Sequence, residues 1–149
     1  VDQWDAKERI IDWSKTKNLQ PHAVPVPLLA AELIESIKPN EYGWFFPSAK
    51  DPSKPVSHGT LYSFVWRQRD RGVIPYATNR DLRRTFKTLA GTAGVPKEIR
   101  DRLQNHALQD VSSKHYDRWH YMVEKRAGMA KWDKFVRAML AKKRLKAAA

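Results

Sequence analysis

The chain has no cysteine among its 149 residues, which excludes a disulfide framework and any metal site built on thiolates. Acidic residues are also scarce: 16 Asp and Glu stand against 28 Lys and Arg, for a formal net charge of +12. No run of about 18 apolar residues occurs, so the sequence predicts no membrane-spanning helix. What remains is about one domain of basic sequence, and such a charge favours a polyanionic partner, either nucleic acid or an acidic membrane surface.

Hydrophobic patterning predicts a mainly α fold with a small antiparallel β-hairpin or sheet at its start, which is an α+β class. Residues 9–13 and 22–26 are predicted to be strands joined by a turn. Apolar residues at helical spacing, with capping and stop signals, predict five helices over 28–37, 60–71, 79–93, 96–104 and 121–142. Residues 1–141 are then one domain, and the basic run 142–149 is expected to be a disordered tail.

The helix predicted over 79–93 has two different faces. Its apolar face is formed by Leu82, Phe86, Leu89 and Ala93. Its basic face is formed by Arg80, Arg83, Arg84 and Lys87, at positions i, i+3, i+4 and i+7. On the preceding helix, the side chains expected to be buried are Tyr62, Val65 and Trp66.

Three short segments stand out when they are taken in order. They are Asp-Leu-Arg-Arg-Thr at 81–85, Leu-Gln-Asn-His at 103–106, and Lys-His-Tyr-Asp-Arg at 114–118, with Tyr116 ten residues after His106. This order resembles the second half of the catalytic domain of tyrosine recombinases, the family of phage-type integrases. That family has a His-x-x-Arg element on a helix, then a Leu-Gly-His element, then a tyrosine nucleophile. The early Thr-Lys-Asn at 16–18 and Val-Pro-Val-Pro at 24–27 are similar to its β-hairpin lysine and the following strand, so the resemblance covers nearly the whole chain.

The resemblance implies a site that cleaves and rejoins DNA through a 3′-phosphotyrosyl intermediate. Tyr116 would attack the phosphate, Arg83 would bind its non-bridging oxygens, and His106 would hydrogen-bond the same phosphate. Lys17 would protonate the departing 5′ oxygen, with Lys15 near the same turn as the alternative. Tyr116 is preferred as the nucleophile over Tyr121 because Tyr121 begins an amphipathic helix, and over Tyr76, which precedes the basic helix.

Elementary chemistry agrees with these roles. A planar guanidinium meets two phosphate oxygens at once, which suits an arginine on the reacting phosphate. A tyrosine has an ordinary pKa of about 10, and nearby cations favour the phenolate that attacks. The leaving alkoxide needs a proton donor within reach, as a lysine on a hairpin provides. No metal and no other cofactor are expected, because the positive side chains take the place of a divalent ion.

The sequence departs from the family pattern at three places. The first position of the His-x-x-Arg element is Arg80, which cannot accept a proton, so only a contact role on the phosphate is assigned to it. The residue before His106 is Asn105 instead of Gly, which is tolerated if the turn is left-handed. The family's first catalytic arginine precedes the opening strand. Because the chain starts at Val1 without Met, we expect an internal cut that removes this arginine and leaves the fragment a poor nuclease.

The resemblance also implies partners. Double-stranded DNA carrying attachment sites is the expected ligand, with self-association into a tetramer on it and no membrane, in a bacterial cytoplasm near the nucleoid. The side chains expected to contact DNA outside the reaction centre are Lys15, Arg84, Lys87, Lys114 and Arg118. Three alternatives stay open: a catalytically inert DNA-binding module, a type IB topoisomerase-like enzyme, and a basic RNA-binding protein. The last would give Tyr116 no role.

Overall fold

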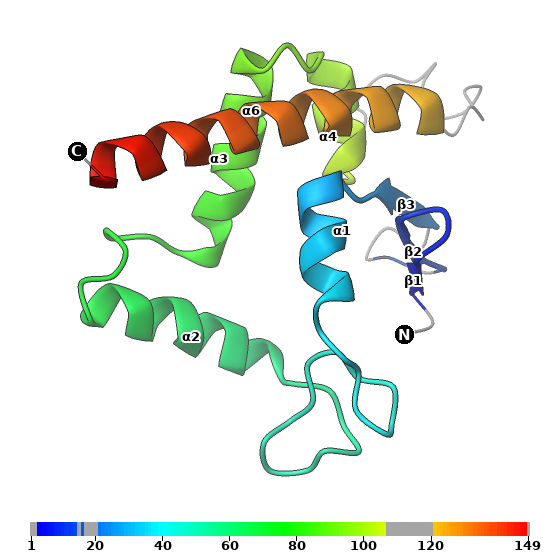
Figure 1. The fold of residues 1–149 in the computed structure, drawn as a ribbon. Helices are drawn as coiled ribbons and strands as arrows, with labels where there is room; N and C mark the ends of the chain where they lie inside the picture. Colours follow the sequence, from blue (N-terminus) through cyan, green and yellow to red (C-terminus); the bar gives the residue numbers. More distant parts are fainter. Residues whose placement is uncertain (1–2, 15, 17–20, 107–120, 149) are drawn as a thin grey trace.

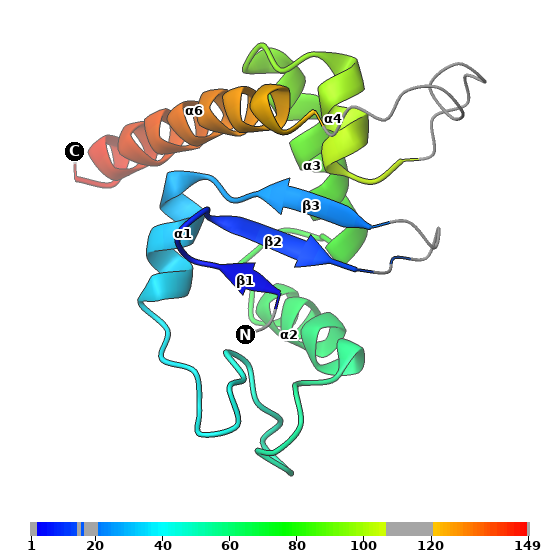
Figure 2. The same ribbon diagram turned by 90° about the vertical axis from the view of Figure 1, so that its right-hand side faces the viewer.

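The structure is a computed structural model that describes residues 3–14, 16, 21–106 and 121–148. Within these residues it has five helices and one three-stranded antiparallel sheet, which confirms the mixed, mainly helical class (Figure 1). The longest helix runs across the other elements, and the sheet lies at one side of the molecule (Figures 1 and 2). The predicted hairpin corresponds to the last two strands of this sheet, which directly precede the first helix.

The sheet has the order β1-β2-β3, with both pairs antiparallel. Its strands are β1 (Trp4–Asp5), β2 (Ile10–Trp13) and β3 (His22–Pro25). In the β2–β3 pair, Trp13 lies opposite His22 and Ile10 lies opposite Pro25, so the proline stands at the end of an edge strand, where a missing N–H is tolerated. The two-residue β1 was not predicted, because so short a strand has no periodic pattern.

The helices agree with the prediction in order and nearly in extent. They are α1 (Leu28–Glu35), α2 (His58–Asp70), α3 (Asn79–Thr92), α4 (Lys97–Leu103) and α6 (Met122–Ala148). Residues 142–148, which were expected to belong to a disordered tail, are described as the end of α6. Lys, Arg, Leu and Ala are strong helix formers, and no Gly or Pro interrupts the run. In the described part of the chain, no helix has the length and apolar character needed to cross a membrane.

Three helices end in the same way, on a residue with positive φ. Gly72 follows α2 with φ 68°, Gly94 follows α3 with φ 81°, and Asn105 follows α4 with φ 51°. After α3, the N–H of Val95 donates to the carbonyl of Ala90 over 2.9 Å, which is the six-residue bond of a Schellman motif. Glycine as a stop signal was therefore a correct guide to the ends of α2 and α3.

The core lies where α3, α4 and α6 meet. Its buried members are Ala90, Val95, Ile99 and Leu103, and the partly buried side chains packed on them include Phe86, Met129 and Trp132. Phe86 meets Trp132 edge to face, with ring centroids 5.3 Å apart. The predicted apolar face of α3 was thus partly right, but Leu82 is 68% exposed, because it lies more than one turn beyond the point where α6 covers α3.

Polar contacts fix α6 to the other side of the fold. Asp133, whose side chain is only 12% exposed, accepts a hydrogen bond from the N–H of Leu29 at the start of α1, over 2.7 Å. Lys125, only 7% exposed, donates from Nζ to the carbonyl of Ala23 in β3 over 3.0 Å. These bonds hold α6 against both α1 and the sheet, and the same helix also packs on α3 and α4.

The aromatic side chains of α2 are exposed, contrary to the prediction. Tyr62 is 61% exposed and Trp66 is 48% exposed, while Phe64 on the other side of the helix is 54% exposed. Burial of such side chains requires an element packed over them, and the described residues place none there. The apolar character of α2 was correctly identified, but the sequence of one helix does not specify what covers it.

Candidate functional site

The start of α3 is fixed by a capping box. The Asp81 carboxylate accepts hydrogen bonds from the N–H and the hydroxyl of Thr78, each over 2.8 Å. These bonds, followed by the nearby Arg84, hold the pKa of Asp81 below its usual range. Arg84 Nη1 lies 3.2 Å from Asp81 Oδ1, so the charge of Arg84 is partly compensated on its own helix. The cap sets where α3 begins and therefore which way its basic side chains project.

Arg83 is tied to the end of α4. Its Nη2 donates to the carbonyl oxygen of Gln104, and the Gln104 side chain donates from Nε2 to the Arg83 carbonyl over 2.7 Å. A guanidinium has five N–H donors, so this single tether orients its plane and still leaves donors for an anion. The Arg83 side chain is exposed, as a residue that binds a DNA phosphate has to be.

A charged cluster joins α3 to the turn after α4. Asp101 Oδ1 lies 2.6 Å from Lys87 Nζ and 3.0 Å from His106 Nδ1, and Lys87 Nζ lies 3.2 Å from the same ring nitrogen. The hydrogen bond from Lys87, and next the one from His106, lower the pKa of Asp101 although burial opposes them. Lys87 lies one turn after Arg83, so two successive turns of α3 hold Gln104 and His106.

The turn that presents His106 is a Schellman motif with Asn105 in the left-handed position. The N–H of His106 donates to the Asp101 carbonyl over 2.9 Å, and the N–H of Asn105 donates to the Arg102 carbonyl over 3.2 Å. With φ of 51°, Asn105 has the left-handed conformation that a residue other than Gly was expected to need at this position. Asparagine is one of the few side chains that adopt it readily.

Replacing Asn105 with Ala is expected to lower the free energy of unfolding by about 1 kcal/mol, because a Cβ-bearing residue without a local hydrogen-bonding side chain is strained there. Asn105→Gly is the matched variant and is expected to cost little or to stabilise. Urea denaturation of the two variants measures the difference. Equal stability of Asn105→Ala and Asn105→Gly would contradict a left-handed turn.

An open hollow brings the hairpin to the same place. Its lining includes Thr16 and His22 from the hairpin, Arg83 from α3, and Gln104 and Asn105 from the turn after α4. Trp13, Val24, His58 and Leu103 complete it. Side chains of the hairpin, α2, α3 and the turn after α4 thus share one open hollow, in which Arg83 is the cationic side chain among the described lining residues.

His22 is held at the edge of this hollow. Its Nε2 lies 3.3 Å from the Leu103 carbonyl oxygen, and its ring stacks on Trp13 with centroids 6.0 Å apart. Burial lowers the pKa of His22, and the nearby ammonium of Lys125 lowers it further. Burial also lowers the pKa of Lys125, together with Arg102. His22 thereby ties the hairpin to α4.

The lowered pKa of His22 predicts a loss of stability in acid. Native His22 stays neutral at pH values where the unfolded chain, with its ordinary value of 6.5, already binds a proton. The free energy of unfolding therefore falls as the pH decreases below about 6.5 towards the native pKa. His22→Gln keeps a donor for the Leu103 carbonyl but does not titrate. Denaturation at pH 7.5 and 5.5 is expected to show a smaller drop for this variant, and an equal drop would refute the assignment.

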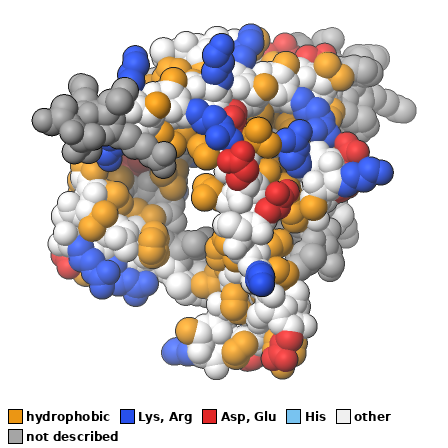
Figure 3. Space-filling model, in the orientation of Figure 1, with side chains coloured by type: hydrophobic (Ala, Val, Ile, Leu, Met, Phe, Trp, Pro, Cys, Tyr) orange, Lys and Arg blue, Asp and Glu red, His pale blue; other side chains and the backbone are white. Residues whose placement is uncertain are grey.

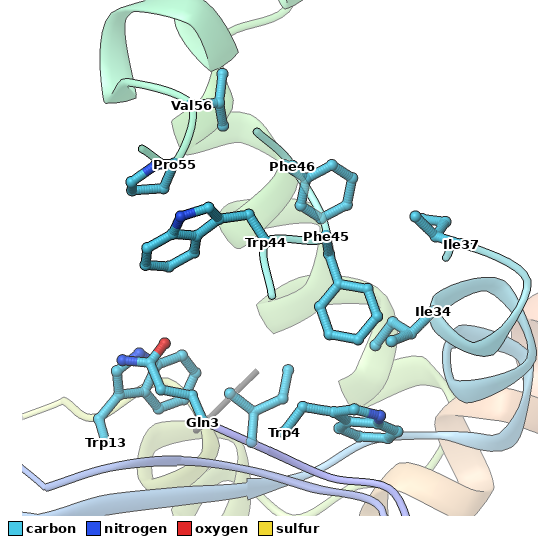
Figure 4. A pocket seen from close by; sticks show the side chains of 11 residues that line it. Gln3, Trp4, Trp13, Ile34, Ile37, Trp44, Phe45, Phe46, Pro55 and Val56 are labelled. Atoms are coloured by element: carbon cyan, nitrogen blue, oxygen red, sulfur yellow. The ribbon is translucent and has the colours of Figure 1, made fainter. Parts of the chain in front are cut away.

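A second hollow, of about 330 Å³, lies between the sheet and the loop before α2 (Figure 4). Trp44, Phe45 and Phe46 of the loop face Trp4 and the neighbouring side chains of the sheet across it (Figure 4). None of the described residues that line it is charged. It therefore has the shape of a site but no group for phosphate chemistry. Phe46 is 59% exposed, so this aromatic segment of the loop is only partly covered.

The structure brings together two of the five predicted catalytic residues. Arg83 contacts Gln104, two residues before His106, and His106 contacts Lys87, one turn after Arg83 on α3. Arg80 is exposed one turn before Arg83 and has no ion pair with the described part of the chain. Tyr116 and Lys17 lie outside the described residues, as do the predicted DNA contacts Lys15, Lys114 and Arg118. Of the other two predicted contacts, Arg84 is paired with Asp81 and Lys87 with Asp101.

On the face shown in Figure 3, the basic side chains do not gather into one patch. Lys and Arg side chains lie along α6 and at the end of α2, with Asp and Glu among them towards the centre. Charge on this face therefore does not mark a binding surface. No group of three or more potential His, Cys, Asp or Glu metal ligands occurs among the residues that are described.

Sequence reasoning missed Asp101 and Gln104. Both are ordinary polar residues on an amphipathic helix, and only the packing of α4 beside α3 shows what they contact. A signal for Asp101 was nevertheless present, because a left-handed residue directly after a helix places the next residue beside the carbonyl five positions back. No comparable local signal points to Gln104.

Comparison with known proteins gives one distant relative. The chain is 26% identical over 143 residues to the prophage integrase IntA of Escherichia coli strain K12, an alignment that covers 91% of the chain and 34% of that protein. The chain thus spans about a third of the length of this relative. No protein-family model matches the chain, and no solved structure gives a significant match. The similarity supports an integrase-like relative with a role in DNA recombination.

Proposed function

We propose that the protein is a site-specific DNA recombinase that cleaves and rejoins DNA through a 3′-phosphotyrosyl intermediate. The single observation that carries the proposal is that Arg83 and His106 both lie where α3 contacts the turn after α4, with Arg83 lining a hollow that also includes residues of the hairpin. These residues are 23 positions apart and were singled out separately by the motif order. The distant integrase relative supports the same reaction class.

In the proposed reaction the phenolic oxygen of Tyr116 attacks the phosphorus, and the bond from phosphorus to the 5′ oxygen breaks. Arg83 neutralises the charge that builds on the non-bridging oxygens, where a guanidinium acts most strongly. Lys17 gives its proton to the departing 5′ oxygen. The phosphotyrosyl bond keeps the energy of the phosphodiester, so a 5′ hydroxyl can reverse the step without ATP. Self-association into a tetramer on two duplexes, and the bacterial cytoplasm as the location, are part of the proposal.

The test is the covalent adduct. The full natural protein is incubated with a nicked duplex that carries its attachment site, and the products are separated under denaturing conditions. Tyr116→Phe is expected to abolish the slow-migrating protein–DNA species, while Tyr121→Phe keeps it. An adduct that persists in Tyr116→Phe would reject the nucleophile. No adduct with any variant, while binding to DNA falls steeply with salt, would reject the enzyme.

A second function is favoured by one observation, which is Arg80 at the position where the family usually has His. A chain that lost its proton acceptor there would bind DNA without cutting it. The adduct assay separates this inert DNA-binding module from the recombinase, since both bind duplex DNA but only one becomes attached to it.

A further inference from the structure

We infer that Asp101 is a positioning residue that holds the Nδ1–H tautomer of His106, so that Nε2 of His106 is the proton acceptor of the reaction. The inference deepens the proposed function and rests on it. It assigns to His106 a role other than donating a hydrogen bond to the phosphate, and it gives Asp101 a function.

Asp101 holds His106 at two points. Its carbonyl oxygen accepts from the His106 N–H over 2.9 Å, and its Oδ1 lies 3.0 Å from Nδ1 of the ring. The Asp101 side chain is only 16% exposed, whereas that of His106 is 35% exposed. The backbone and the ring are therefore both fixed from the protein side, while part of the ring stays accessible.

The chemistry of the cluster selects the tautomer. A carboxylate only accepts hydrogen bonds and an ammonium only donates them. Asp101 stays ionised because Lys87, 2.6 Å away, lowers its pKa. If Nδ1 of His106 carried no proton, its lone pair would face the carboxylate oxygen at 3.0 Å, which is repulsive. Lys87 Nζ lies 3.2 Å from the same nitrogen, but its shorter contact, 2.6 Å, is with Asp101 Oδ1, so the ammonium proton that faces the cluster goes to the carboxylate. Nδ1 therefore donates to Asp101, and in the neutral ring Nε2 has the free lone pair, as in other carboxylate-oriented histidines.

The reaction needs such an acceptor. Arg80 cannot take a proton, although it stands where the family usually has His. Of the histidines that line the hollow, His22 uses Nε2 to bind the Leu103 carbonyl, and His58 has no partner in the described chain that fixes its tautomer. In the inferred step the phenolic proton of Tyr116 moves to Nε2 of His106, the phenolate oxygen attacks phosphorus, and the 5′ oxygen leaves with the Lys17 proton. Rejoining reverses each transfer.

Two variants separate proton acceptance from phosphate contact. His106→Gln keeps a side-chain N–H donor that can reach the position of Nε2 but cannot accept a proton. We expect it to slow adduct formation about 10²-fold or more, as much as His106→Ala, which is the scale of general acid–base catalysis. Lys50→Gln, at an exposed site in the loop before α2 and away from the hollow, is the control and is expected to stay within about twofold. A His106→Gln variant with near wild-type rate would overturn the inference in favour of phosphate contact.

Asp101 is tested by the tautomer itself. Nitrogen-15 spectra of the natural protein at pH 8, labelled at its histidine side chains, are expected to show Nδ1–H for His106. Asp101→Asn, whose amide can donate to Nδ1, is expected to switch it to Nε2–H and to slow the adduct. Asp101→Glu is expected to restore part of the rate, and Glu98→Gln, on the same helix, controls for charge. A merely structural role would change stability without switching the tautomer.

The proposed function and the positioning role of Asp101 can fail separately. If the wild-type protein forms no adduct, the proposed function fails, and the spectra still decide whether Asp101 fixes the ring. An Nε2–H signal from His106 in the wild type, or no change in Asp101→Asn, overturns the positioning role even where the adduct forms. An unfolded Asp101→Asn would be recognised by circular dichroism, and Asp101→Glu with the His106 variants then carry the test.

Discussion

Arg83→Lys is expected to lower the rate of covalent adduct formation by about 10²- to 10³-fold, the scale on which one donor to a transition-state oxyanion acts. Lysine keeps the charge but loses the planar fork that meets two phosphate oxygens at once. It also loses the tether from Nη2 to the Gln104 carbonyl, so the charge is no longer aimed from a fixed place. The measurement is the single-turnover rate on a nicked duplex at saturating protein.

Arg67→Lys on α2 is the matched control, because it makes the same substitution at an exposed site away from the hollow. Its rate is expected to stay within about twofold of wild type, as for most surface changes. DNA affinity measured beside the rate separates two causes. A large rise in dissociation constant with an unchanged saturated rate would mean that Arg83 only binds DNA, and that would refute its place on the reacting phosphate.

The sequence predicted the local elements of this site well and its long-range contacts poorly. The extent of α3 could be predicted because both its ends are encoded nearby, in Thr78 with Asp81 and in Gly94. The left-handed turn at Asn105 could likewise be predicted from the residues around it. The two hydrogen bonds between Arg83 and Gln104 could not be predicted, since they depend on how two helices pack, and no periodicity in either helix specifies that packing.

Burial was predicted least well, for a physical reason. Hydrophobic spacing says that Tyr62, Trp66 and Leu82 can be buried, but burial also requires a partner surface of the right shape in the right place. In the described chain these side chains remain exposed, whereas Ala90, which no prediction emphasised, lies fully buried at the centre. A small residue at a helix crossing is selected by close approach, and its hydrophobicity alone does not reveal it.

The same close approach makes Gly128 the position where one change should cost most in stability. A Cβ added to it would lie 3.0 Å from Val95 Cγ1 and 3.2 Å from Ile99 Cγ2, tighter than ordinary van der Waals contact. Ala would gain about 1 kcal/mol of helix propensity against this crowding. Val has two methyl groups more than Ala, and the contact between α6 and α4 has no room for them. Gly128→Val is therefore expected to lower the free energy of unfolding by about 2 to 3 kcal/mol.

Ala127→Val, one residue earlier on an exposed side of α6, isolates the packing contribution, because a valine on a helix surface costs only about 0.6 kcal/mol. Urea denaturation of the two valine variants gives the difference, and equal stabilities would show that α6 does not approach α4 closely.

The crowding caused by Gly128→Val is also expected to affect the candidate site. Pushing α6 from Ile99 displaces the short helix α4, whose last turn holds Asp101 beside His106. Gly128→Val is therefore also expected to slow adduct formation, although the residue contacts no DNA in the proposed reaction.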